Sequence, residues 1–129
     1  MIHQVHLKKP GCSGRGVRYR ILKPSELDHN EMQAARGLEK DDTVLKYELD
    51  VLHMGLYMMV TAYTEPTQKD LNGSAKWIKA DPDSLETQWN ELFTTKDTVL
   101  LKAIYKREHG TSNAEVEEIL SGKVDVLEE

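Results

Sequence analysis

The sequence predicts a mainly α-helical, α+β protein: four to five helices pack round a central apolar helix, with a short β element at the N-terminus. Three observations predict this class. Apolar residues recur every three to four positions over 45–63, which is the spacing of a helix with a buried face. β-forming residues alternate with other residues over 17–22. Helix-start patterns stand at Ser25-Glu26, Asp81-Pro82 and Ser112-Asn113-Ala114-Glu115.

Length and charge predict one domain with two electrically different parts. The 129 residues (39% hydrophobic, 30% charged) suffice for a single domain, residues 1–129, with a real core. Residues 1–23 contain six basic residues and no acid, whereas residues 24–129 contain 11 basic residues against 22 acids. We therefore expect a basic extended N-terminal arm or hairpin at 1–23 and an acidic helical body at 24–129.

The N-terminal segment is predicted to form two short strands. Val17, Tyr19 and Ile21 alternate with Arg18 and Arg20, so that β-formers lie on one face and basic residues on the other. A Gly- and Pro-rich loop at 10–16 separates this stretch from the apolar residues at 2–7. The two strands form either a hairpin or an arm that pairs with another chain.

Two helices are expected in the first half of the body. The first spans 25–38, with Ser25 as its cap after Pro24. The second begins at Asp42 or Thr43 and extends to Tyr63 as the central helix. Its stripes are Leu45, Leu49, Leu52, Leu56 and Met59, and beside them Tyr47, Val51, Met54 and Met58. A buried core helix explains these residues. The alternative is that Met54, Met58 and Met59 dock a partner, because flexible thioethers adapt to varied surfaces.

The second half of the body contains a loop and further helices. A polar loop is expected at 65–74, followed at 75–79 by one turn or a brief strand. Asp81 caps a helix that carries Leu85, Trp89, Leu92 and Phe93 on one face. The stretch 94–97 ends that helix and caps another, which stops at Gly110. A capping box at 112–115 opens a last short helix, and residues 123–129 remain as a tail.

No catalytic pattern emerges from the residues. The glycine loop precedes a strand-like stretch and lacks the Lys-Ser/Thr pair of a phosphate-binding loop. His3, His6 and Cys12 lack a fourth zinc ligand nearby. Cys12 needs a base and a lowered pKa to act as a nucleophile, and one sequence shows neither. We therefore expect no enzyme activity, no metal and no cofactor.

The basic segment is the expected partner-binding element. Arg15, Arg18, Tyr19 and Arg20 could meet the acidic body of a neighbouring subunit, bind nucleic acid through phosphate contacts, or simply be solvated. Nucleic acid is the less favoured partner, because the acidic body would be repelled from it.

Two observations bear on location. The single Cys12 allows no internal disulfide, which favours the cytoplasm. No apolar run approaches the ~18–20 residues of a membrane span, and the start lacks the order of a secretory signal. We expect no membrane association.

Several stretches also carry a resemblance. They are the basic start Val17-Arg18-Tyr19-Arg20-Ile21-Leu22, the apolar helix ending Met58-Met59-Val60-Thr61, and the closing stretches 95–105 and 112–116. In this order they resemble the small, acidic, helical proteins encoded among the tail genes of tailed bacteriophages, especially tail assembly chaperones. The similarity covers most of residues 17–122 in general character.

The resemblance implies non-enzymatic protein–protein interaction in tail assembly. The partners would be other phage tail or virion proteins, or further copies of the chain, in the cytoplasm of the bacterial host or in the virion. One alternative is a small structural protein of the virion, in the tail, baseplate or connector. A further alternative is a nucleic-acid-binding or anti-host regulatory protein that uses the basic arm.

Overall fold

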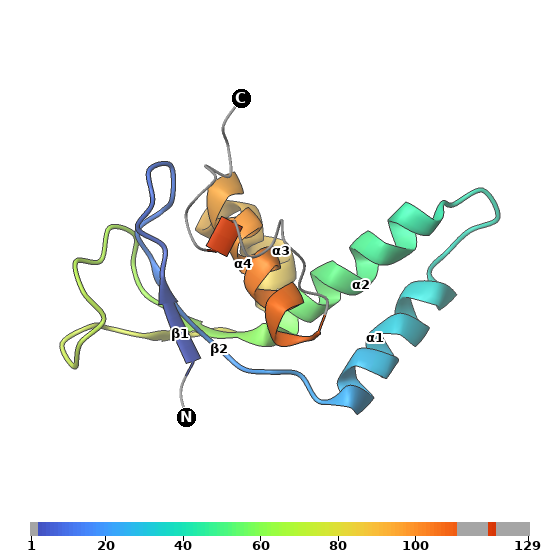
Figure 1. Cartoon of the computed structure of the whole chain (residues 1–129), viewed down its shortest axis with the longest axis horizontal. Helices are drawn as coiled ribbons and strands as arrows, with labels where there is room; N and C mark the ends of the chain where they lie inside the picture. Colours follow the sequence, from blue (N-terminus) through green and yellow to red (C-terminus); the bar gives the residue numbers. More distant parts are fainter. Residues whose placement is uncertain (1–2, 111–118, 121–129) are drawn as a thin grey trace.

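The computed structural model describes residues 3–110 and 119–120 and confirms the α+β class. Within these residues, four helices accompany a four-stranded antiparallel sheet. The sheet lies at one end of the molecule with α3 and α4 beside it, and the α1–α2 hairpin projects from the opposite side (Figure 1). The elements are β1 (His3–His6), β2 (Gly16–Tyr19), α1 (Pro24–Arg36), α2 (Val44–Met59), β3 (Val60–Tyr63), β4 (Ile78–Lys79), α3 (Pro82–Leu92) and α4 (Thr95–Glu108).

The N-terminal segment forms a hairpin that belongs to the sheet. β1 and β2 pair antiparallel, with Val5 opposite Val17, and β3 pairs with the other edge of β2. The connecting loop turns through Gly14 at φ +83°, where a Cβ would lie 2.7 Å from the backbone of Thr67, so only glycine fits. Of the two forms expected for the two N-terminal strands, the hairpin is the one observed over residues 3–19, where the strands pair within the same chain.

The central helix ends earlier than the sequence predicts. α2 stops at Met59, and residues 60–63 form β3 instead of a last helical turn. The apolar run continues through this point, so periodicity alone cannot locate the change. Pairing with β2 decides it: the N–H of Arg20 donates to Met59 O at 2.9 Å, and Val60 and Tyr63 lie opposite Tyr19 and Val17.

The start of α1 also differs from the prediction. Ser25 is not the cap; Pro24 occupies the first helical position, where its missing N–H costs nothing, and Lys23 is the N-cap. The Glu26 carboxylate accepts the N–H of Lys23 at 2.9 Å. The helix ends at Arg36 rather than at residue 38, with Gly37 as its C-cap.

The helix starts of the second half are confirmed. Asp81 caps α3 by accepting the N–H of Ser84 at 3.0 Å, with Pro82 at the first position. Thr94 and Asp97 form a capping box at the start of α4. Gly110 follows the end of α4 at φ +83°, and the stretch at 75–79 yields the brief strand β4. The capping box at 112–115, the helix that it opens (apart from residues 119–120) and the tail at 123–129 lie outside the described residues.

The core lies between the sheet and the helices. α2 contacts α1, α3, α4 and β3, but only its second half is buried: Leu56 is 1% exposed, whereas Leu45 is 62% exposed. Leu45 and Leu49 were expected on the buried face, and the structure places them in solvent, because the first half of α2 extends past the body. The core residues are Leu7, Val17, Tyr19, Leu22, Leu56, Met59, Val60, Leu85, Trp89, Phe93, Leu100, Leu101, Ile104 and Tyr105.

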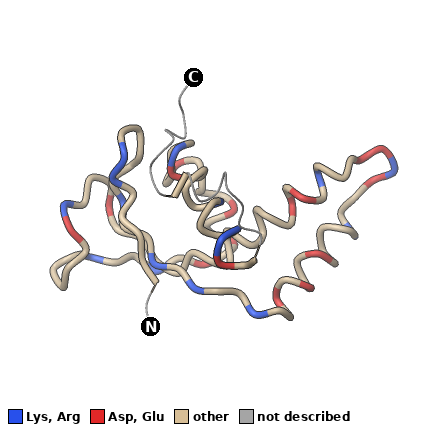
Figure 2. Tube along the Cα trace, in the orientation of Figure 1, with Lys and Arg blue, Asp and Glu red and all other residues tan. Residues whose placement is uncertain are grey.

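Basic and acidic residues lie in different regions of the fold. Figure 2 shows basic residues along the N-terminal hairpin and the segment into α1, and many acidic residues along the projecting α1–α2 hairpin. The charge asymmetry of the sequence is thus retained in the fold as two regions of different sign.

Candidate protein-binding surface

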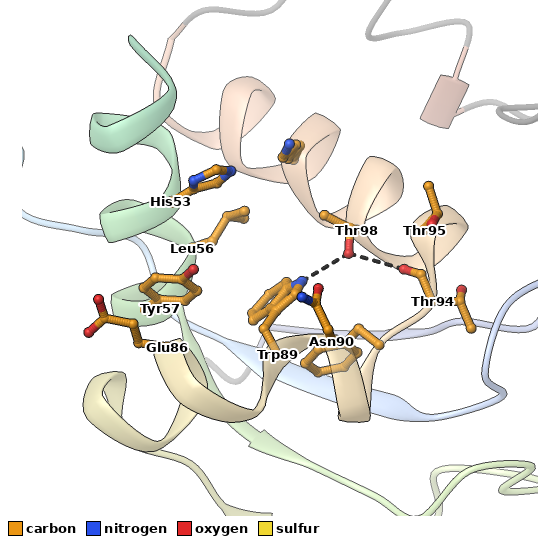
Figure 3. Close-up of a pocket in the computed structure, with 11 residues that line it drawn as sticks. His53, Leu56, Tyr57, Glu86, Trp89, Asn90, Thr94, Thr95 and Thr98 are labelled. Atoms are coloured by element: carbon orange, nitrogen blue, oxygen red, sulfur yellow. Dashed lines mark hydrogen bonds between the residues drawn. The ribbon is translucent and has the colours of Figure 1, made fainter. Parts of the chain in front are cut away.

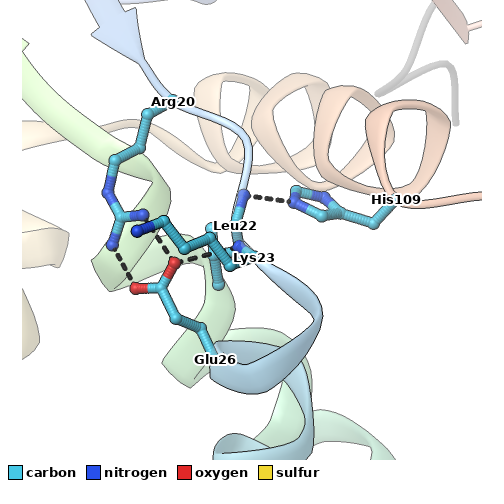
Figure 4. A network of polar contacts seen from close by, with 5 residues as sticks. All are labelled: Arg20, Leu22, Lys23, Glu26 and His109. Atoms are coloured by element: carbon cyan, nitrogen blue, oxygen red, sulfur yellow. Dashed lines mark hydrogen bonds and ion pairs between the residues drawn. The ribbon is translucent and has the colours of Figure 1, made fainter.

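Arg20 lies in an ion pair within the chain. Its guanidinium donates to both carboxylate oxygens of Glu26, at 2.8 and 2.7 Å, and so joins the end of β2 to the start of α1 (Figure 4). This bidentate contact, followed by the hydrogen bond from the N–H of Lys23, lowers the pKa of Glu26 to about 2. Beside it, His109 Nε2 accepts the N–H of Leu22 at 2.9 Å.

Arg15 is bound by the backbone of two other elements. Its Nε donates to Leu92 O and its Nη1 to Thr64 O, both at 2.8 Å. The guanidinium carbon lies 5.6 Å from the centre of the Tyr63 ring. Arg15 therefore ties the end of the glycine loop to α3 and to the end of β3.

Arg18 and Tyr19 point to opposite sides of β2. The Arg18 guanidinium stacks on Trp77, 4.0 Å from the ring centre, and its buried Nε has no partner among the described residues. Tyr19 belongs to the core, where burial raises the pKa of its hydroxyl. The four candidate residues of the basic segment therefore do not form one face, and each contacts its own chain.

The three candidate methionines separate into two environments. Met59 is 0% exposed in the core. Met54 and Met58, one helical turn apart, line a hollow of about 660 Å³ between α1, α2 and α3. We call it the methionine hollow; its walls are His29, Asn30, Gln33, Asp50, His53, Met54, Tyr57, Met58, Pro82, Asp83 and Glu86.

A second hollow adjoins the first. It measures about 750 Å³, lies between α2, α3 and α4, and shares His53, Tyr57 and Glu86 with the methionine hollow (Figure 3). We call it the tryptophan hollow, because Trp89 stands in its wall with Nε1 donating to Thr98 Oγ1 at 2.9 Å. Burial, and next the charge of Lys102, lowers the pKa of His53. The two hollows lie next to each other along α2.

The polar residues of the methionine hollow were not predicted from the sequence as site residues. Asn30 is 3% exposed, and its Nδ2 has no hydrogen-bond partner among the described residues. A signal existed, because Asn30 lies between Leu27 and Ala34 on the apolar stripe of the first helix, where a polar residue is out of place. Asp83 and Glu86 carry no such signal; they reach the hollow only through the packing of α3.

The residues considered for chemistry have structural contacts. Burial, and next the charge of Asp97, raises the pKa of the Cys12 thiol to about 11, so at neutral pH the thiol is protonated and weakly nucleophilic. The N–H of Ser13, in the glycine loop, donates to the Asp97 carboxylate at 3.1 Å. Within residues 3–110 and 119–120, no three His, Cys, Asp or Glu side chains gather as a metal site.

Comparison of the chain with protein-family models, with curated proteins and with solved structures gives no match. In the described part of the chain, no helix combines the length and the apolar character that crossing a bilayer requires.

Proposed function

We propose that this chain acts without catalysis, by binding other proteins during bacteriophage tail assembly, as a tail assembly chaperone does. The observation that carries the proposal is the methionine hollow, where Met54 and Met58 provide an adaptable apolar surface beside a polar rim. A chaperone role requires such a recess for an aggregation-prone segment of a partner, such as a tape-measure protein. In this proposal α2 is the central scaffold, since it contacts α1, α3, α4 and β3.

In this proposal the binding surface lies on α2, and not on the basic segment as the sequence alone suggests. Arg15 donates hydrogen bonds to Leu92 O and Thr64 O, and Arg20 donates to the Glu26 carboxylate. Arg18 stacks on Trp77. Contacts of this kind leave fewer free donors for a neighbour's carboxylates or for phosphates. The methionine hollow, in contrast, has Met54 and Met58 as an apolar floor that no other part of the described chain fills.

The test is co-expression of the chain with the neighbouring tail proteins, followed by co-purification. Met54→Gln with Met58→Gln keeps side-chain length but makes the floor polar, and we expect this variant to lose the bound tail protein. The matched control is Met32→Gln, since Met32 is exposed on α1 and lines neither hollow. A tail protein that co-purifies equally with all three chains would contradict the proposed surface.

A further measurement separates the alternatives. A chaperone leaves before the particle is complete, whereas a small structural protein of the virion stays. Mass spectrometry of purified particles distinguishes the two. Retention on DNA that falls steeply with added salt would instead support the nucleic-acid-binding alternative.

A further inference from the structure

We propose that the methionine hollow binds a cationic amphipathic segment of another polypeptide. The apolar side chains of the segment lie on Met54 and Met58, and its lysine or arginine side chains face Asp83 and Glu86. This inference rests on the proposed function and adds to it the chemistry of the partner.

Charge is the first argument. Three carboxylates line the methionine hollow, from Asp50, Asp83 and Glu86; among the described residues no lysine or arginine lines it, and Lys102 lines only the adjoining tryptophan hollow. Lys46 Nζ lies 2.8 Å from Asp50, so this carboxylate is already paired, whereas Asp83 and Glu86 form no ion pair with another described residue. His53 lines both hollows, and burial, followed by the charge of Lys102, lowers the pKa of its ring and so disfavours the charged form. The rim is therefore complementary to cations.

Asn30 is the second argument. A buried N–H without an acceptor destabilises a folded protein, so native structures seldom contain one. Nδ2 of Asn30 has no acceptor among the described residues, and its side chain stands in the wall of the hollow. The atom is itself buried, so a carbonyl oxygen of an occupant would accept its hydrogen bond once the Asn30 side chain rotates toward the hollow. This donor thus marks the hollow as a place completed by a polar, carbonyl-bearing ligand.

Size is the third argument. The methionine hollow of about 660 Å³ lies next to the tryptophan hollow of about 750 Å³, and the two share His53, Tyr57 and Glu86 as wall residues. Single small-molecule sites occupy about 300–1,000 Å³. Two adjacent hollows of this size along α2 fit a chain segment with several side chains better than one small molecule or ion. Helical segments bind in this way when their apolar faces lie in a groove.

The experiment measures binding of designed peptides by fluorescence anisotropy. The probe is a dye-labelled peptide of about 14 residues, or four turns, with leucines on one helical face and lysines on the other. Its partner peptide carries glutamate in place of every lysine. We expect the lysine peptide to bind, more weakly as salt is added, and the glutamate peptide not to bind. Equal binding of both peptides, or of neither, would overturn the inference.

Charge variants locate the site. Asp83→Asn with Glu86→Gln removes two charges from the rim, and we expect about tenfold weaker binding of the lysine peptide. The matched control, Asp41→Asn with Glu65→Gln, removes the same charge from exposed positions outside both hollows and should bind as the wild type does. Equal weakening in both variants would mean that the peptide responds only to net charge, and the site would be wrong.

Asn30→Leu provides an independent readout. Since Leu removes a buried donor without a partner, we expect the free protein to melt about 3 °C or more higher. The same variant should bind the lysine peptide more weakly. A side chain with only a structural role would give the opposite, a lower melting temperature with unchanged affinity.

Failure of this inference is distinguishable from failure of the proposed function. A tail protein that remains bound to the Asp83→Asn, Glu86→Gln variant but is lost from the Met54→Gln, Met58→Gln variant would refute the cationic partner alone. The chain could instead self-associate through the hollow, which light scattering would show, and not bind the lysine peptide. A second copy of the chain would then be the occupant, and the cationic partner would again be refuted.

Discussion

At the scale of single residues, Asp97 joins two distant parts of the chain. Its side chain is 0% exposed, caps α4 by accepting the N–H of Thr94 at 2.9 Å, and accepts the N–H of Ser13 at 3.1 Å. A charged acceptor strengthens both contacts. The glycine loop is thereby held at the start of α4, more than 80 residues later in the chain.

Asp97→Asn should therefore destabilise the protein by about 1–3 kcal/mol, because the amide loses the charge and turns a donor toward backbone N–H groups. Urea unfolding measures this loss. The control is Asp81→Asn, an exposed N-cap at α3, where Asn serves as well as Asp and we expect little change. Equal losses in the two variants would show that Asp97 acts only as a cap.

At the scale of elements, the Arg20–Glu26 pair connects the sheet to α1. The pair is partly exposed, so its contribution to stability is about 0–1 kcal/mol. The pKa of Glu26 falls from 4.5 to about 2 in the folded chain. A depressed folded pKa stabilises the folded state above the unfolded pKa, and this stabilisation is lost as the pH falls from about 4.5 to about 2.

Arg20→Gln should accordingly be slightly less stable than the wild type at pH 6, with the difference shrinking toward zero by pH 2. Urea unfolding across this pH range measures it. Lys46→Gln is the control, because Lys46 forms an exposed pair with Asp50 through a single hydrogen bond within one helix. A difference between Arg20→Gln and wild type that stays constant from pH 6 to pH 2 would contradict the linkage.

Elements that begin with helix-capping residues were predictable from the sequence. An element whose structure depends on pairing with a distant strand was not. Asp81-Pro82 and Thr94–Asp97 identify helix starts within four residues, so both caps of α3 and α4 were found. Val60–Tyr63 continues an apolar run, and only its contact with β2 makes it a strand. In the same way, the spacing of Met54 and Met58 showed a shared face, whereas Asp83 and Glu86 reach that face through tertiary packing.

At the scale of the whole molecule, the fold combines a packed body with a projecting helical hairpin. The first half of α2 extends beyond α3 and α4 and packs mainly on α1 (Figure 1). Val44 and Leu45 are 73% and 62% exposed, while Gly55 lies so close to the Tyr105 ring that a Cβ would clash with it. Burial is thus concentrated at one end of the helix, and the methionine hollow lies between the two regions.

We expect this unequal burial to divide α2 into two zones of stability. Few buried contacts permit local opening below the free energy of global unfolding. Amide hydrogen exchange should therefore be faster at residues 47–51 than at 55–59, although both stretches are helical and hydrogen-bonded. Residues 100–105 of α4, in the core, provide the internal reference for slow exchange. Uniform protection from residue 47 to residue 59 would mean that the projecting α1–α2 hairpin and the packed body unfold as one unit, and that the first half of α2 is no less stable than the second.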